Sequence, residues 1–140
     1  MSKNNKVFVG LSAFAAILVS AGCGQRELSP KDTVPVHGRA LLHGEPIRYA
    51  LIELNPTDTE GVPTSGRTDA DGYFMLWTYG NEQPDGAVPG RYSVTIDSGG
   101  AKPVGGIPKG EPGPTILPDD IGEITVVIDS SGGEIEIAIP

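Results

Sequence analysis

The sequence is poor in the residues on which several common functions depend. It contains one cysteine and one tryptophan in 140 residues, and aromatic side chains make up 6% of the chain. A lone cysteine cannot form an internal disulfide. Ten Lys and Arg stand against 18 Asp and Glu, for a formal net charge of −8. Nucleic acids and anionic membrane surfaces require a basic face that neutralises phosphates, so this balance argues against electrostatic binding to either.

An apolar run long enough to span a bilayer is also missing. The charge-free segment at residues 7–19 has 13 residues, whereas a membrane helix needs roughly 20. Lys3 and Lys6 precede this segment and small residues follow it, which is the layout of a secretory signal peptide. We therefore expect residues 1–22 to be removed on export and the polar, aperiodic residues 23–33 to form a short tether.

The cysteine lies immediately after the apolar run, in the sequence Ser20-Ala21-Gly22-Cys23. These four residues resemble the lipobox of bacterial lipoproteins, Leu-(Ala/Ser)-(Gly/Ala)-Cys, with Ser20 where leucine is usual. The resemblance implies that Cys23 receives diacylglycerol, becomes the first residue after cleavage and is acylated at its amino terminus. Several acyl chains anchor a protein stably. We expect an exported lipoprotein of the bacterial cell envelope, on its periplasmic or surface side, and an ordinary secretory signal with a free thiol is the alternative.

Glycine and proline are abundant, with 20 and 13 copies, close to the level typical of disordered chains. What favours a folded domain is the alternation of apolar residues in short runs separated by turn residues. Outside the signal peptide no helical period is present. We predict an all-β domain at residues 34–140, an immunoglobulin-like sandwich of about seven strands. The strands are expected near residues 36–42, 50–54, 64–68, 73–78, 90–97, 124–128 and 135–139.

Two motifs stand out among these strands. They read Thr68-Asp69-Ala70-Asp71-Gly72-Tyr73-Phe74 and Pro89-Gly90-Arg91-Tyr92-Ser93-Val94-Thr95, and they follow Val36-His37-Gly38-Arg39 and Gly44-Glu45-Pro46-Ile47. In this order they resemble the carboxypeptidase regulatory-like, or transthyretin-like, seven-stranded domain of many small bacterial lipoproteins. The resemblance implies a non-catalytic accessory module without a cofactor.

The candidate metal ligands have simpler interpretations. Asp69 and Asp71 look like a fragment of a calcium loop, but calcium needs six to eight oxygens and the remaining ligands are missing. We expect a hairpin turn there, in which the Asp side chains accept backbone amide hydrogen bonds and Gly72 adopts a positive φ. His37 and His43 are six extended residues apart, roughly 20 Å, too far to share an ion. No metal site is therefore expected.

Catalytic chemistry has one candidate group. There is no Gly-x-Ser-x-Gly elbow, and Cys23 is assigned to lipidation, so a nucleophile is lacking. The alternative to a non-enzymatic module is an envelope hydrolase or transferase that uses a carboxylate pair among Asp119, Asp120 and Glu123. Such a pair would need a cleft and a raised pKa. We expect no enzymatic activity.

Alternation on the strand near residues 73–78 produces an unusual outward face. Phe74 and Leu76 point toward the core, so the side chains that point the other way are Tyr73, Met75, Trp77 and Tyr79. Aromatic rings offer large contact areas with polar handles and can stack on sugars or on a partner's side chains. Residues 98–122, a Gly/Pro-rich segment of unusual length, could instead fold over this face. We expect that cover, with an exposed site for an envelope protein or polysaccharide as the alternative.

Overall fold

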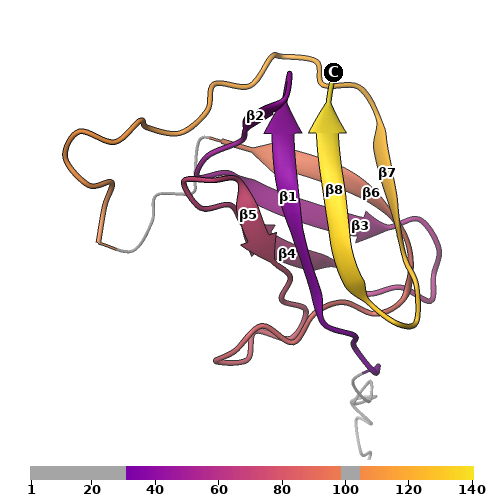
Figure 1. The fold of residues 1–140 in the computed structure, drawn as a ribbon. Coiled ribbons are helices and arrows are strands. Elements are labelled where there is room, and N and C mark those ends of the chain that lie inside the picture. The colour runs from indigo at the N-terminus through magenta and orange to yellow at the C-terminus, as the bar shows by residue number, and fades with distance from the viewer. Residues whose placement is uncertain (1–30, 99–104) are drawn as a thin grey trace, which may run out of the picture.

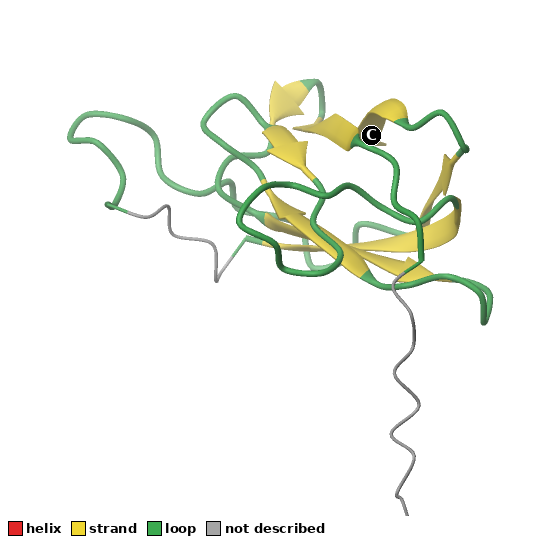
Figure 2. Ribbon diagram, turned by 90° about the horizontal axis from the view of Figure 1, so that it is seen from below, coloured by secondary structure: helices red, strands yellow, loops and turns green. Residues whose placement is uncertain are grey.

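The computed structural model describes residues 31–98 and 105–140. Cys23, the predicted signal peptide at residues 1–22 and the tether up to residue 30 lie outside this part. The described chain consists of strands, turns and loops without a helix, and two β-sheets pack face to face (Figures 1 and 2). The prediction of an all-β, two-layered domain is thus confirmed. Across the described ranges, no helix has the length and apolar character needed to cross a membrane.

The first sheet is built around β1 (Val36–Leu42). β8 (Gly133–Ile139) pairs with it in parallel along its whole length. The opposite edge of β1 is shared by two short antiparallel strands, β5 (Tyr73–Met75) near its start and β2 (Glu45–Pro46) near its end. β1 is therefore the central strand of this sheet.

The second sheet is antiparallel throughout. Its order is β4 (Thr64–Arg67), β3 (Leu51–Pro56), β6 (Gly90–Asp97) and β7 (Ile124–Ile128). The inward side chains of both sheets alternate with outward ones, as expected for strands with one wet face. The core between the sheets contains Val36, Ala40, Ile52, Leu54, Phe74, Leu76, Tyr92, Val94, Ile96, Ile128, Ile137 and Ile139.

Each of the seven predicted strands has a counterpart, with two differences. β2 is an additional two-residue strand after a tight turn, in which His43 and Gly44 have φ values of 52° and 81°, as a two-residue hairpin requires. β5 ends at Met75. The Leu76 amide still donates to the Val36 carbonyl of β1 at 3.1 Å, but the next residue, Trp77, pairs with Ser65 of β4.

The predicted hairpin between residues 64–68 and 73–78 is wrong in one respect. The turn at residues 69–72 is present, and the Asp69 amide donates to the Tyr73 carbonyl at 2.9 Å. However, β4 pairs with β3 and β5 pairs with β1, so the turn carries the chain from one sheet to the other. Each short strand thereby gains a longer neighbour, and Phe74 is placed in the core.

The described part of the long connection between β6 and β7 extends from one end of the sandwich (Figure 1). This part, residues 105–122, is fastened to the segment after β2. The Thr115 amide donates to the Arg48 carbonyl at 3.1 Å, and the Arg48 amide donates to Thr115 Oγ1 at 2.8 Å. Nearby, the Tyr49 hydroxyl donates to a Glu111 carboxylate oxygen at 3.3 Å, and burial together with this neighbour raises the pKa of Tyr49.

Candidate binding groove

The outward row that starts on β5 is open to solvent. The exposed fractions are 48% for Tyr73, 58% for Met75, 43% for Trp77 and 38% for Tyr79. The expected cover by residues 98–122 is not found for the described part of that segment, because its hydrogen bonds to Arg48 hold it beside the end of β2. Residues 99–104 lie outside the described part.

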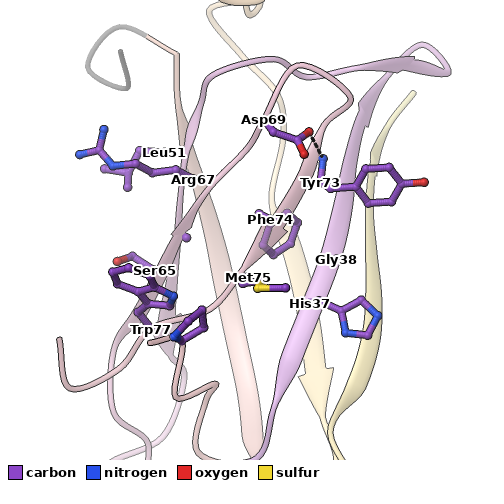
Figure 3. Close-up of a pocket in the computed structure, with 12 residues that line it drawn as sticks. His37, Gly38, Leu51, Ser65, Arg67, Asp69, Tyr73, Phe74, Met75 and Trp77 are labelled. Carbon is purple, nitrogen blue, oxygen red and sulfur yellow. Dashed lines mark hydrogen bonds between the residues drawn. The ribbon is translucent and has the colours of Figure 1, made fainter. Parts of the chain in front are cut away.

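Three of the four row residues line a cavity of about 690 Å³ (Figure 3). Tyr73, Met75 and Trp77 are exposed, and the other large or charged residues that line it are His37, Leu51, Arg67, Asp69, Phe74 and Pro84. A second cavity of about 230 Å³ shares His37, Met75 and Pro84 and extends toward Pro35. We call this surface the aromatic groove.

The aromatic groove exists because the two sheets meet at one side of the sandwich. The Trp77 amide donates to the Ser65 carbonyl at 2.8 Å, and the Ser65 amide donates to the Trp77 carbonyl at 3.1 Å. This pair places the outward faces of β1, β5, β4 and β3 next to one another. Gly66 permits the approach, since a Cβ atom at this position would collide with the Met75 carbonyl oxygen.

Tyr73 is held in place at one end of the groove. The Arg39 guanidinium lies 5.1 Å from the centre of its ring, and Arg39 Nε donates to the Asp71 carbonyl at 3.2 Å. The Asp69 carboxylate accepts the amides of Asp71 and Tyr73 at 2.8 and 3.0 Å. Gly72 has a φ of 80°. The interpretation of Asp69 as a turn residue is therefore confirmed.

Tyr79 differs from its neighbours in the row, because it does not line either cavity. Its hydroxyl accepts the Lys31 amide at 2.7 Å and donates to the Lys31 carbonyl at 3.2 Å. The Lys31 ammonium also forms an ion pair with Glu60 at 3.1 Å. Tyr79 therefore lies outside the two cavities, and its hydroxyl holds Lys31, near the end of the predicted tether, against the domain.

The remaining candidates lie away from the groove. Asp119, Asp120 and Glu123 are exposed in the connection before β7, and Asp120 accepts the Gly122 amide at 2.8 Å. His37 lies in the groove, whereas His43 lies in the turn after β1. Residues 31–98 and 105–140 include no group of three acidic, histidine or cysteine side chains placed to hold a metal ion.

Sequence reasoning missed the residues that form the groove walls. Arg67 shares the outward face of β4 with Ser65, a parity that the sequence shows, and the predicted hairpin placed residues 64–68 beside residues 73–78. The contribution of Arg67 to a cavity on this face was not foreseen. Pro84 lies in a loop whose position depends on Asp85, which accepts the amides of Thr78 and Tyr79 at 2.7 and 3.0 Å. Comparisons with protein-family models, curated proteins and solved structures give no match to this chain.

Proposed function

We propose that this protein is a non-catalytic, lipid-anchored binding module of the bacterial cell envelope and that its ligand site is the aromatic groove. The observation that carries this proposal is the exposure of Tyr73, Met75 and Trp77 in a cavity of about 690 Å³. Contiguous exposed apolar surface in a small domain is typical of an interaction site. An envelope protein or a polysaccharide that binds here would cover these side chains and remove them from water.

The finer fold type belongs to the same proposal. We assign the sandwich to the immunoglobulin-like or transthyretin-like type, in line with the sequence motifs. The fully buried Tyr92 supports this assignment, because its hydroxyl donates to the Val88 carbonyl at 2.6 Å. This bond is similar to the tyrosine corner of immunoglobulin-like sandwiches, where a tyrosine hydroxyl binds the backbone a few residues upstream.

A binding role is favoured over catalysis by the chemistry of the groove. Its lining side chains are mainly aromatic, aliphatic and cationic, and Asp69 is already occupied by two backbone amides. The carboxylates that a hydrolase or transferase would use, Asp119, Asp120 and Glu123, are exposed and lie outside both cavities. We therefore assign no reaction to this protein.

The lipid anchor is tested by acylation. A fatty-acid analogue supplied to cells that express the protein should label the wild type and leave Cys23→Ser unlabelled. Lys31 lies eight positions after Cys23, and a fully extended chain over eight positions reaches about 30 Å. The hydrogen bonds between the Tyr79 hydroxyl and the Lys31 backbone would thus keep the domain close to the membrane. Equal labelling of both proteins would reject the anchor.

The groove is tested by capture from solubilised envelopes with the intact lipoprotein. Proteins and polysaccharides retained by the wild type should be lost with Trp77→Ala and kept with Ile116→Ala. Ile116 is the matched control, because it is 89% exposed but lies outside the groove. Identical capture by Trp77→Ala and the wild type would show that the groove is not the ligand site.

A further inference from the structure

We propose that the occupant of the aromatic groove is an acidic polysaccharide whose sugar rings stack on Trp77 and Tyr73 and whose uronate carboxylates pair with Arg67. The proposal rests on the proposed function, since it names the ligand of the same groove. Four observations support it. Within the described residues the Arg67 guanidinium has no partner, and the charge of the cavity lining differs from that of the whole chain. The two rings are spaced for a chain of sugars, and the backbone of Ser65 is already bonded to Trp77.

The guanidinium of Arg67 is free to bind a ligand. Arg67 is exposed and lines the cavity, and no other residue within the described ranges forms a hydrogen bond or an ion pair with its side chain. Two other arginines are engaged: Arg39 Nε donates to Asp71 and Arg48 Nε donates to Gly113, both at 3.2 Å. A guanidinium presents a planar set of donors that matches a carboxylate in a bidentate pair.

The charge of the groove contrasts with the charge of the chain. The protein has a formal net charge of −8, yet the ionisable residues that line the larger cavity are Arg67, His37 and Asp69. The Asp69 carboxylate is held by two backbone amides, and Glu53, which lies opposite Ser65 on the outer face, does not line the cavity. Arg67 and Asp69 offset one another in formal charge, so an anionic ligand meets less repulsion at the cavity than the net charge of the whole chain would produce.

The spacing of the rings suits a chain of sugars. Tyr73 and Trp77 are four residues apart on the same face, and extended chain rises 3.3–3.4 Å per residue, so the two positions are about 13 Å apart. This span is longer than a single pyranose ring. Met75 lies between them and is 58% exposed. Two stacking positions joined by an apolar floor would bind successive rings of one chain.

The backbone at the groove disfavours an extended peptide as the occupant. A peptide that adds to a sheet edge needs free backbone amides and carbonyls. Here both backbone groups of Ser65 are bonded to Trp77, and the other edge of β5 pairs with β1. The backbone of Ser65 is therefore unavailable to an added strand, which favours recognition by side chains over strand addition at this point of the groove.

The test uses the detergent-solubilised lipoprotein, because Trp77 is its only tryptophan and reports directly from the groove. Its emission is titrated with polygalacturonate, with neutral dextran and with polyglutamate, at low and high salt. We expect a saturable change with polygalacturonate that weakens with salt. Charge-assisted hydrogen bonds to a carboxylate typically contribute enough that Arg67→Gln should weaken this binding by about 10-fold or more.

Arg91→Gln is the matched control. It removes the same charge from an exposed position on β6 outside the cavity, so binding should stay within about two-fold of the wild type, as for a distant surface charge screened by salt. Circular dichroism of both variants verifies that they are folded. Equal binding of dextran and polygalacturonate, unaffected by Arg67→Gln, would overturn the acidic ligand and leave the groove intact.

Two further results would also overturn the inference. A response to polyglutamate without one to polygalacturonate would indicate an acidic peptide partner. No response to any of the three polymers would exclude polysaccharide binding of this kind. In both cases the proposed function would still be decided separately by the capture experiment with Trp77→Ala and Ile116→Ala.

Discussion

β5 and β8 lie on opposite sides of β1 in the same sheet, yet their outward faces differ. Both strands bury apolar side chains on the inward face, with Phe74 3% and Ile137 1% exposed. On the outward face β8 has Glu134 and Glu136, the usual polar surface of a half-wet sheet. The same face of β5 carries tyrosine and methionine. Because β8 folds with a polar face, packing alone does not account for the apolar face of β5.

The contrast distinguishes the inward residues, which stabilise the sandwich, from the outward residues, which line the groove. The inward set of β5 completes the core between the sheets. The outward set contacts solvent in a cavity and is positioned by Arg39 above Tyr73 and by the backbone pair at Trp77. Changes to the two sets should therefore have different consequences, and the variants below test this.

The largest expected effect is on the inward face of β5. Phe74→Ala should destabilise the domain by about 3 to 5 kcal/mol, the range for removing a buried aromatic side chain. The adjacent outward change, Met75→Ala, should alter the free energy of unfolding by less than about 0.5 kcal/mol. Urea unfolding of both variants measures the difference. Similar losses would mean that the outward face is part of the core.

The turn that carries the chain into β5 should show the next largest effect. Gly72→Val should cost about 1 to 3 kcal/mol, because a β-branched residue is strained at positive φ. A Cβ atom there would also lie 2.7 Å from the Ala40 carbonyl oxygen. Gly80, with a φ of 68° and no heavy atom within 4 Å of its Cβ position, is the control. Gly80→Val should therefore cost less, and an equal cost would remove the contact with Ala40 from the explanation.

Tyr92 and Tyr73 repeat the comparison within one residue type. Tyr92→Phe deletes the buried bond to Val88 and should cost about 1 kcal/mol, whereas Tyr73→Phe should leave stability unchanged. Burial raises the pKa of Tyr92, so its contribution to stability is fully present below the unfolded pKa of about 10 and is lost as pH rises above it. Thermal unfolding between pH 8 and 11 should show a shallower alkaline decline for Tyr92→Phe. An unchanged decline would contradict this role.

The outward face of β8 should give the smallest effect. Glu134→Ala and Glu136→Ala should each change the free energy of unfolding by less than about 0.5 kcal/mol, as at ordinary surface sites. Neither should alter ligand binding by the groove, since both residues lie on the other side of β1. A loss of capture with either variant would extend the binding face beyond the groove.

The sequence was sufficient to locate the strands, because each has one buried and one wet face and alternates accordingly. Alternation also identified the outward positions of Tyr73, Met75 and Trp77. It could not identify Arg67 and Pro84 as groove residues, because strand parity does not show where the two sheets meet and leave a cavity. The turn at Asp69 forms the same local hydrogen bonds whether the chain returns to its own sheet or crosses to the other.

The position of the Gly/Pro-rich connection, residues 98–122, also could not be predicted from the sequence. Its described part is fixed by hydrogen bonds between Thr115 and the backbone of Arg48 and Pro46. On the side of Arg48 and Pro46 each of these bonds uses a main-chain atom, which every residue possesses, so no side-chain pattern marks the partner. The hydrogen bonds between the Tyr79 hydroxyl and the backbone of Lys31 likewise have a main-chain partner that no sequence pattern marks.

The most direct test of the open groove is the fluorescence of Trp77, the only tryptophan of the chain. Its side chain is 43% exposed, so the folded protein should emit at long wavelength and acrylamide should quench the emission readily. Polygalacturonate should protect it from quenching. A short-wavelength emission that acrylamide does not reach in the ligand-free protein would contradict an open groove at this face.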